Sequence, residues 1–491
     1  MQRKTTIRVT AIFILFIMLL SSFLGCGKED ATPESKEIMT EADETTTAEV
    51  TKEPFDEIQE ADFGSYNFRV LTLSAGINAT NRFTQEIWVE AETGDVINDA
   101  IFRRNSMIAD RLGVNIIACP VDDVFSAATK SAMSGSDDYD LHGMYTKFAT
   151  ITIASEGLVR DWNKIPGLNL DTVYWNSNCR DNLSVCGKLY LMSGAILISE
   201  IDDTLAMIYN KKLAEDNGLE SIYTLVFDGK WTLDTFAEQA TAIYTDIDGD
   251  GVMKPKNDLF GYIQDPASMT NNWLFSCDLL GEKILDDGVI DMNMDQNRIQ
   301  TTLEKLAKVN SSDGIQIGLD LYEGLDYFKE DRIYIYAIIL RNIELLRDME
   351  SDFGIIPYPK FDENQPDYLN HVGGSSPILT VPITNTSDDE RLRQVLEGMA
   401  AASYQVVLPA YFDVALKEKY SRDKETQDML DIILKSRTYN LGYLGSISFV
   451  WDVAALIKGG KTDFSSYWAK SESSMTKKYQ KVIDKLLEIE D

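Results

Sequence analysis

Basic residues are scarce in this 491-residue chain, which has 46 Lys and Arg residues against 79 Asp and Glu residues and a formal net charge of −33 at pH 7. A protein that binds nucleic acid needs a basic surface to neutralise phosphates, so this composition argues against nucleic acid as a partner. Histidine is scarcer still. Only His142 and His371 are present, which leaves little for histidine-based metal sites or acid–base catalysis. The sequence also lacks the Gly-x-Ser-x-Gly, His-Glu-x-x-His, Walker and Gly-x-Gly-x-x-Gly motifs.

Cysteine is also sparse, with five residues in the whole chain. Cys26 follows an apolar N-terminal segment, and the other four are spread widely, at Cys119, Cys179, Cys186 and Cys277. Cys179 and Cys186 could bridge a short loop. A chain of this length can bury a large core without disulfides, so the favoured interpretation is that these four are small buried hydrophobic residues.

The N-terminus has the pattern of an export signal. Arg3, Lys4 and Arg8 form a basic region, and an unbroken apolar run from Ala11 to Leu20 follows it. This run is shorter than the 20 or so residues that a membrane span needs. Residues 23–26, Phe-Leu-Gly-Cys, resemble a bacterial lipobox, although Phe23 departs from the usual Leu-type residue. The sequence therefore predicts a signal peptide over 1–25, diacylglycerol on Cys26 and attachment to the extracellular face of the cell membrane. A plain secretory signal or an uncleaved anchor is the alternative.

Residues 26–61 are predicted to form a lipidated, disordered acidic tether. This stretch is rich in Thr, Glu and Asp and nearly free of aromatic residues, so it buries too little apolar surface to offset the entropy of ordering. Its repelling charges should extend it and hold a folded body away from an anionic membrane. An acidic tail that binds a partner is the alternative.

After the tether, apolar strands alternate with amphipathic helices. Strands are predicted over 68–74, 114–119 and 139–145, and helices over 95–112, 124–133 and 151–156. Asp95 is a candidate N-cap of the first helix, and Gly113 a candidate stop. This βαβαβα order predicts an α/β fold with a largely parallel sheet. Ligands in such sheets bind at the carboxyl ends of strands, which points to the loops at 74–78 and 145–148.

Four segments resemble a known family. They are DYDLHGMYTKFATITIASEGLVRDW (138–162), DTLAMIYNKKLA with the following GKWTLDTFAEQA (203–240), DFGIIPYPKF (352–361) and GGSSPILTVPITN (373–385). Their order is similar to that in extracellular solute-binding proteins of carbohydrate ABC importers, the maltose-binding-protein type. Two helix starts accompany them: Thr232 is a predicted N-cap, and Ser387 with Glu390 is a predicted capping box.

The resemblance implies two α/β lobes, each a mostly parallel sheet flanked by helices, joined by hinge crossovers and closing on a ligand between them. Carried onto this chain, lobe one spans 62–200 and 374–408, and lobe two spans 201–373 and 409–491. The resemblance also implies that the protein is not an enzyme. It implies a monomer that captures a carbohydrate, expected to be an oligosaccharide, and delivers it to an ABC permease in the membrane. A peptide or another polar solute is the alternative ligand.

The strongest local chemical signal is the acidic segment Asp246-Ile-Asp-Gly-Asp-Gly251. It places carboxylates at positions 1, 3 and 5 and glycine at position 6, as in an EF-hand calcium loop. Val252 would add its carbonyl at position 7. Position 12 holds Asn257 instead of the usual glutamate, so Asp258 is the predicted replacement. We therefore expect a structural Ca²⁺ bound by Asp246, Asp248, Asp250, Val252 and Asp258, with a solvated acidic turn as the alternative.

Aromatic and acidic residues supply the predicted ligand contacts, because sugar rings stack on flat aromatic faces while their hydroxyls need polar partners. The residues predicted on position in the sequence are Tyr145, Glu200, Asp202, Trp273, Tyr411 and Trp451. His371 is interpreted as a crossover or surface residue, and no residue is predicted to be catalytic.

Two other functions remain open from the sequence. A surface adhesin or scaffold stabilised by calcium would also carry an export signal and a tether. An extracellular glycoside hydrolase is also compatible, because 79 acidic residues make suitably spaced carboxylate pairs inevitable by chance. The ordered two-lobe pattern favours the binding protein over both.

Overall fold

The computed structural model describes residues 53–75, 82–145, 150–265, 268–414, 424–445 and 449–489. The predicted signal peptide, Cys26 and the tether as far as residue 52 lie outside the described residues. No helix within the described ranges is long and apolar enough to cross a membrane.

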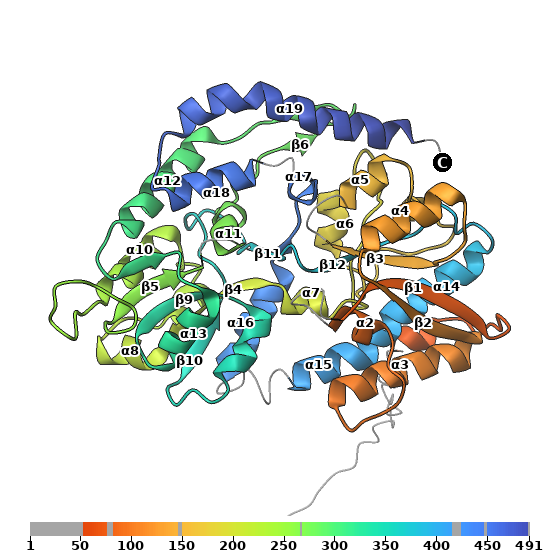
Figure 1. The fold of residues 1–491 in the computed structure, drawn as a ribbon, viewed down its shortest axis with the longest axis horizontal. Helices are drawn as coiled ribbons and strands as arrows, with labels where there is room; N and C mark the ends of the chain where they lie inside the picture. Colours follow the sequence, from red (N-terminus) through yellow and green to blue (C-terminus); the bar gives the residue numbers. More distant parts are fainter. Residues whose placement is uncertain are drawn as a thin grey trace, which may run out of the picture. The chain divides into compact units, whose positions relative to one another are not determined.

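The first of two main sheets is formed early in the chain. Its strands, in spatial order, are β12 (Pro377–Thr380), β3 (Leu141–Tyr145), β1 (Tyr66–Leu73) and β2 (Val114–Val121). β1 is parallel to both β2 and β3, and only the returning strand β12 is antiparallel. The helices around this sheet include α2 (Arg82–Ile87), α3 (Val96–Leu112), α4 (Val124–Ser134), α5 (Thr150–Ser155) and α14 (Asp389–Ala402). This sheet and its helices are called lobe one (Figure 1). The predicted largely parallel sheet is confirmed here.

The second sheet is mixed. Its order is β10 (Phe353–Ile356), β4 (Leu205–Asn210), β9 (Ile333–Ile339), β5 (Phe260–Gln264) and β8 (Ile315–Ile317). β5 is parallel to β8 and β9, whereas β4 is antiparallel to both of its neighbours. The prediction of a mostly parallel sheet is therefore wrong for the second sheet. Every residue of β4 and β9 is buried. Strands buried on both faces have no polar side to fix their direction, and their apolar runs predict burial without predicting orientation.

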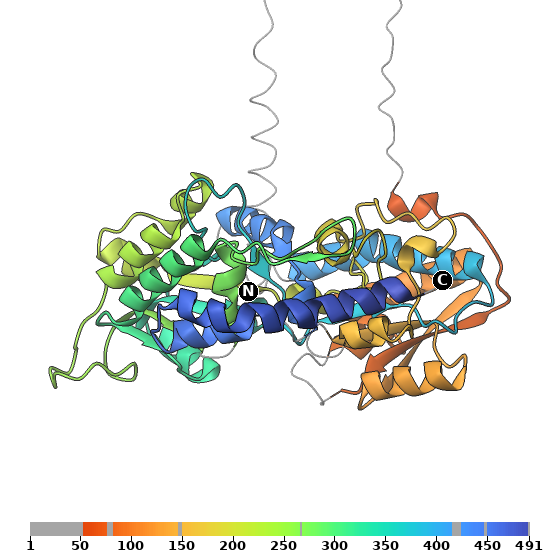
Figure 2. The same cartoon turned by 90° about the horizontal axis from the view of Figure 1, so that it is seen from above.

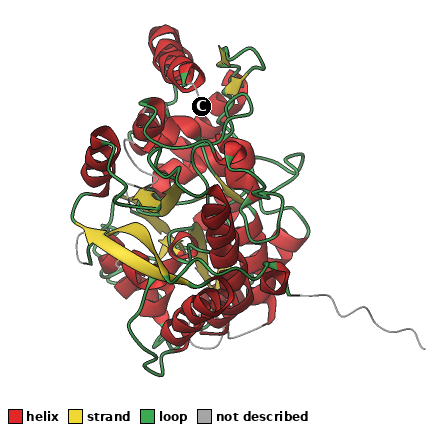
Figure 3. Cartoon of the chain, turned by 90° about the vertical axis from the view of Figure 1, so that its right-hand side faces the viewer, coloured by secondary structure: helices red, strands yellow, loops and turns green. Residues whose placement is uncertain are grey.

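Helices pack against the second sheet, and with it they are called lobe two. Figure 3 views the chain from the side of lobe one and shows its strands among helices. They include α8 (Lys211–Asp216), α9 (Ile222–Phe227), α10 (Leu233–Ala242), α12 (Gln296–Asn310), α13 (Leu321–Lys329) and α16 (Lys424–Lys435). A hairpin of β6 (Lys283–Ile284) and β7 (Ile290–Asp291) precedes α12, after α11 (Ser268–Ser276).

Local signals fixed the helix ends that the sequence predicted. Asp95 caps α3 by accepting a hydrogen bond from the Asn98 amide, and Gly113 ends the helix in the left-handed conformation (φ 61°). Thr232 caps α10 in the same way. The predicted capping box of Ser387 is wrong: Asp388 is the N-cap of α14, because its carboxylate accepts from the Arg391 amide.

Residues 53–61, predicted to belong to the tether, pack on lobe one. A short 3₁₀ helix over Pro54–Glu57 buries Phe55, and Ile58 is buried beside it. The Phe55 amide donates to Gln405 Oε1 (3.2 Å), and the Arg111 guanidinium lies 5.3 Å from the centre of the Phe55 ring. Two apolar side chains three residues apart are enough to order this end of an otherwise acidic stretch.

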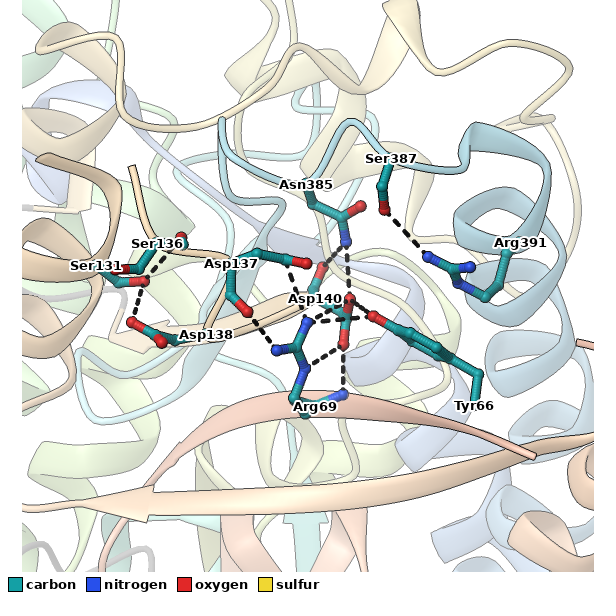
Figure 4. A network of polar contacts seen from close by, with 10 residues as sticks. All are labelled: Tyr66, Arg69, Ser131, Ser136, Asp137, Asp138, Asp140, Asn385, Ser387 and Arg391. Carbon is teal, nitrogen blue, oxygen red and sulfur yellow. Dashed lines mark hydrogen bonds and ion pairs between the residues drawn. The ribbon is translucent and has the colours of Figure 1, made fainter. Parts of the chain in front are cut away.

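A buried carboxylate joins three parts of lobe one at the edge opposite the carboxyl ends of its parallel strands (Figure 4). Asp140, 2% exposed, accepts hydrogen bonds from the Tyr66 hydroxyl (2.8 Å) and the Arg69 Nε (3.0 Å). Asn385 follows β12 in the chain, and its Nδ2 donates to the same carboxylate (3.2 Å). Burial and the bond to Asp140 raise the pKa of Tyr66, so its hydroxyl keeps the proton that it donates.

The four cysteines in the part of the chain that the structure describes are unbridged. Cys179 and Cys277 are buried, as favoured from the sequence, and Cys119 is half-buried. Cys186 is exposed and has φ 48°, so the interpretation of all four as buried residues is wrong at this position. Cys186 lies in a tight turn closed by the backbone hydrogen bonds between Val185 and Lys188, which leaves its side chain on the surface.

Candidate functional site

The carboxyl ends of the parallel strands are the expected place for a ligand. In lobe one β3 ends at Tyr145, and in lobe two β5 ends at Gln264. Residues 76–81, 146–149 and 266–267 follow β1, β3 and β5, and all three segments lie outside the described residues. The described part of the site is therefore formed by the crossovers and by the elements around α11.

Two crossovers lie side by side between the lobes. Thr204 pairs with Val372 in an antiparallel bridge, and the Gly373 amide donates to the Asp203 carbonyl (2.8 Å). The Asp203 side chain is 1% exposed and forms an ion pair with Arg341, which follows the end of β9. Burial lowers the pKa of Arg341. The crossovers thus hold a buried pair of opposite charges whose net charge is zero.

Aromatic rings gather beside the second crossover. They come from α11, β11 (Asn370–His371), α17 (Leu441–Leu444) and α18 (Val450–Lys458). The His371 ring stacks on Phe275, with centroids 4.0 Å apart, and its other contact is the edge of Tyr443 at 4.3 Å. Tyr443 in turn stacks on Trp451 at 5.3 Å. We call these four residues the aromatic cluster.

Neutral polar groups accompany the aromatic cluster. Desolvation lowers the pKa of His371 to about 3, so the ring is uncharged near neutral pH. Neither ring nitrogen of His371 and neither side-chain atom of Asn271 has a hydrogen-bond partner within the described part of the chain. Asn271 lies one turn before Phe275 on α11, and its neighbour Asn272 accepts a bond from the His371 amide (2.8 Å).

Unpaired buried polar groups of this kind are costly, about 1–3 kcal/mol each, so they are expected to have a partner in the working protein. A polyhydroxyl ligand supplies both hydroxyls for such groups and an apolar ring face for aromatic side chains. The cluster therefore has the chemistry to bind a neutral, polar ring compound.

Two cavities lie near these residues. One, of about 420 Å³, adjoins Phe275 and is lined from both lobes, by Asn182 of α6 (Ser177–Leu183) and by Asn440 and Tyr479 among others. The other, of about 680 Å³, lies in lobe one, has a mostly apolar surface that includes Trp88, and shares no residue with the aromatic cluster.

The structure gives four of the predicted ligand residues partners within the protein. Glu200 is buried, accepts from Ser193 and Asn176, and pairs with Arg437 at 3.1 Å; desolvation raises its pKa. Asp202 and Tyr411 come together, because the Tyr411 hydroxyl donates to Asp202 Oδ1 (2.7 Å).

Trp273 is 1% exposed, packs on Phe236 and Tyr358, and donates its ring N–H to Gln264 Oε1 (3.2 Å). Trp451 is half-buried in the aromatic cluster, and Tyr145 is half-buried at the end of β3. Ligand contact by these six residues stays a prediction.

Sequence reasoning missed Asp203, Arg341 and Asn271. It interpreted His371 as a crossover or surface residue, and the structure places it in the crossover, buried. Asp203 is adjacent in sequence to the predicted Asp202, which is the last residue of the short helix α7 (Ser199–Asp202), and Asp203 is the C-cap of that helix. The adjacent amides Asn271 and Asn272, which precede the apolar run Trp273 to Phe275, were the available signal, since buried amides need partners.

The acidic loop has the geometry of a cation site. The carboxylate oxygens of Asp246, Asp248 and Asp250 lie within 4.8 Å of one another. Asp246 accepts bonds from the Gly249 and Gly251 amides (2.7 and 2.8 Å), which curl the loop around the three carboxylates. The donor set of hard oxygens fits Ca²⁺.

Two other predicted ligands of this loop are placed differently. Asp258 is fully buried and accepts from the Ile247 and Lys254 amides (2.9 and 2.6 Å), so it braces the loop from within. Val252 is exposed at the rim. The Lys254 ammonium contacts Asp250 and lowers the pKa of that carboxyl, and a bound cation would compete with it.

Comparison with known proteins extends these observations. No protein-family model and no curated protein matches the chain. Among solved structures, a family 1 extracellular solute-binding protein from Bifidobacterium longum subsp. infantis is similar, with a TM-score of 0.52 and 13% identity over 86% of this chain and 99% of that one. UspC of M. tuberculosis is similar at a TM-score of 0.52 and 14% identity, over 84% and 99% of the two chains.

The GacH receptor of Streptomyces glaucescens, solved unliganded and in complex with acarbose, has a TM-score of 0.50 and 13% identity over 86% and 99% of the two chains. Likeness at this level of identity shows the fold. The chain therefore has the two-lobed α/β fold of extracellular solute-binding proteins.

Proposed function

We propose that this chain is a member of the family 1 solute-binding proteins and the substrate-binding component of a carbohydrate ABC importer. The observation that carries the proposal is the aromatic cluster with its unpaired neutral partners, His371 and Asn271, placed beside a crossover between two lobes. The shared fold with the GacH receptor, which was solved with acarbose, supports a sugar-like ligand. In this proposal the protein binds its ligand reversibly, without turnover, and passes it to a permease.

The mechanism follows from the two lobes. A ligand that contacts both lobes binds the closed arrangement better than the open one, so it shifts the population towards closure. The half-buried ring of Trp451, held by its stacking on Tyr443, favours ring compounds, and the amide of Asn271 gains the hydroxyl partner that it lacks. The permease then needs to recognise only the closed form, and the protein acts as a monomer.

The proposal is tested with the chain from residue 27 to 491 in millimolar calcium, by thermal unfolding and calorimetric titration against mono- and oligosaccharides. A ligand that binds only the folded protein raises the unfolding midpoint by mass action. We expect a saturable shift with one sugar class and recovery of that sugar unchanged. A cleaved sugar would instead indicate a glycoside hydrolase, and no shift with any sugar would contradict the proposal and favour a scaffold.

Two tryptophan variants locate the site. Trp451→Leu removes a ring of the aromatic cluster and should weaken sugar binding at least tenfold, which corresponds to about 1.4 kcal/mol. Trp88→Leu is the matched control, because Trp88 is 44% exposed and lines only the apolar cavity of lobe one. If Trp88→Leu weakens binding and Trp451→Leu does not, the ligand binds elsewhere.

We further propose that Cys26 carries diacylglycerol and anchors the protein to the extracellular face of the cell membrane. The basic and apolar N-terminal pattern and the acidic stretch after Cys26 support this. Cells that express the intact chain should hold the protein in the membrane fraction, with a lipid mass on the peptide that begins at Cys26. Cys26→Ser should release it, and membrane retention without the cysteine would contradict the anchor.

We also propose a structural Ca²⁺ in the acidic loop, held by Asp246, Asp248 and Asp250 and braced by Asp258. Removing calcium with a chelator should lower the unfolding midpoint, and calcium should restore it. Asp248→Asn should abolish this response. Asp286→Asn, which removes an exposed carboxylate of the same lobe, is the matched control. An unchanged midpoint in chelator would leave a solvated acidic turn as the explanation.

A further inference from the structure

The longest helix of the described chain lies across both lobes. α19 (Phe464–Glu488) begins on lobe two and ends against lobe one, as seen from two directions in Figures 1 and 2. Its buried residues recur at helical spacing and form one stripe: Phe464, Trp468, Met475, Tyr479, Ile483 and Leu486. A single rigid helix is therefore shared by two lobes.

The first part of α19 is attached to lobe two. The Phe464 amide, in the first turn of the helix, has no intrahelical acceptor and donates to Gln300 Oε1 of α12 (3.2 Å) as well as to the preceding Thr462 carbonyl (2.8 Å). Further along, the Gln480 side chain bonds the hairpin twice, donating to the Gly288 carbonyl (2.8 Å) and accepting from the Ile290 amide (2.9 Å). These bonds fix the helix to α12 and to the β6–β7 hairpin.

The last turn of α19 is attached to lobe one through the side chains of Lys188 and Tyr190. Lys188 Nζ donates to the carbonyls of Leu486 (3.4 Å), Leu487 (3.3 Å) and Ile489 (2.6 Å). The Tyr190 hydroxyl also donates to the Leu486 carbonyl (3.3 Å). The final carbonyls of a helix have no intrahelical partner and carry partial negative charge, so an ammonium placed there satisfies them and complements the helix dipole.

Lys188 is itself held firmly in lobe one. It closes the tight turn with Val185, and the next residue is tied on both sides: the Leu189 amide donates to Asp161 Oδ1 (2.9 Å), and the Leu189 carbonyl accepts from the Trp162 amide (2.7 Å). Four residues on, Met192 pairs with Leu379 of β12. The Lys188 ammonium therefore moves with lobe one, whereas the carbonyls that it contacts move with a helix that is fixed to lobe two.

We propose that α19 is a strap between the lobes and that Lys188 is its latch, which holds the lobe arrangement of this structure. Hydrogen bonds of this kind fail beyond about 3.5 Å, so a relative shift of the lobes of more than about 1 Å at this point breaks the shortest bond. Rotation of the lobes must therefore open the latch or pull α19 off lobe two. The latch makes this arrangement more populated than it would be without it.

A natural reporter lies beside the latch. Cys186, on the lobe-one turn, is exposed and its Sγ is 3.5 Å from the Leu285 carbonyl of the lobe-two hairpin. Leu285 is 43% exposed, so Leu285→Cys places a second accessible thiol within reach of a short bifunctional maleimide. The rate of cross-linking in the chain from 27 to 491 then measures how much of the time the two lobes hold this arrangement. The Cys186→Ser version gives the background.

In the Leu285→Cys chain, we expect Lys188→Met to slow cross-linking at least threefold. Ending the chain after Lys485 removes the three carbonyls together with the buried Leu486 and its bond from Tyr190, so it should slow cross-linking at least as much. Adding Lys188→Met to the shortened chain should have no further effect, because the ammonium has then already lost its acceptors. Lys212→Met is the matched control, since Lys212 pairs with Asp216 on the surface of lobe two, away from the strap.

If Lys188→Met lowers the unfolding midpoint but leaves the cross-linking rate unchanged, the latch is overturned, and Lys188 only caps the end of α19. Additive effects of the two changes would overturn it as well, because they would mean that the two sites act separately. The test uses no ligand, so its result is independent of the proposed function.

Discussion

The two histidines of the chain are both buried, and together with Glu86 they predict a specific dependence of stability on pH. Desolvation lowers the pKa of His142 and of His371 to about 3, from an ordinary value of 6.5. A group with a lowered pKa stabilises the fold fully above its unfolded value, and this stabilisation is lost as the pH falls from 6.5 towards 3. Between pH 7.5 and 5, each histidine should therefore lower the free energy of unfolding by about 2 kcal/mol.

Glu86 works in the opposite direction. Burial raises its pKa to about 8 from an ordinary 4.5, despite the bonds that it accepts from the Ser199 amide and hydroxyl. A raised pKa stabilises the fold at low pH and this stabilisation is lost as the pH rises through 8, so between pH 7.5 and 5 Glu86 should add about 3 kcal/mol. The intact protein shows only the sum of these effects with those of its other carboxylates, and single variants separate them.

The assay is urea unfolding followed by tryptophan fluorescence at pH 7.5 and 5.0 and at constant calcium. His371→Gln should reduce the loss of stability on acidification by about 2 kcal/mol relative to the parent, and Glu86→Gln should increase that loss by about 3 kcal/mol. Each comparison is made within one variant, so any constant cost of the substitution cancels. His142→Gln is a second, independent measurement of the histidine effect. An unchanged difference between the two pH values for His371→Gln would mean that this ring is charged or solvated in the fold.

Three further predictions concern stability. Asp140→Asn should lower the free energy of unfolding by about 3 kcal/mol, because it breaks a buried ion pair with Arg69. Asp137→Asn, at an exposed carboxylate that contacts the same arginine, should lower it by less than about 1 kcal/mol. Equal losses in urea unfolding would contradict the burial of Asp140. Phe55→Ala should lower the free energy of unfolding by about 3 kcal/mol. A change within about 0.5 kcal/mol would mean that residues 53–58 belong to the tether after all. Gly261→Ala places a Cβ 1.8 Å from the Ala240 carbonyl and should cost more than about 2 kcal/mol by calorimetry, or prevent folding.

The parts of the fold that the sequence predicted well depend on neighbours in sequence. The limits of α3 follow from the cap of Asp95 and from the left-handed Gly113, each of which acts within four residues. The order of strands and helices in lobe one is likewise visible in local periodicity. The direction of β4 is not, because a run of six buried residues is the same whether its partner is parallel or antiparallel.

The site was harder to predict because its pairs are distant in sequence. Glu200, Asp202 and Asp203 are nearly adjacent carboxylates, yet their partners are Arg437, Tyr411 and Arg341. Composition and spacing do not distinguish such residues, since each partner lies more than 130 positions away. The same applies to His371, whose burial depends on rings from α11 and α17.

Charge at the site connects these observations to the choice of ligand. The chain carries a formal charge of −33, yet the unpaired groups at the aromatic cluster, His371 and Asn271, are neutral, and the crossover charges of Asp203 and Arg341 compensate each other. Moving an unpaired charge from water into such a site has a large desolvation cost, whereas a hydroxyl needs only one hydrogen-bond partner. The acidic surface adds repulsion against anions at a distance. Neutral sugars and polyols are therefore favoured over uronates or sugar phosphates, and a titration that ranked an acidic sugar above its neutral counterpart would show that Arg341 leaves Asp203 when the ligand binds.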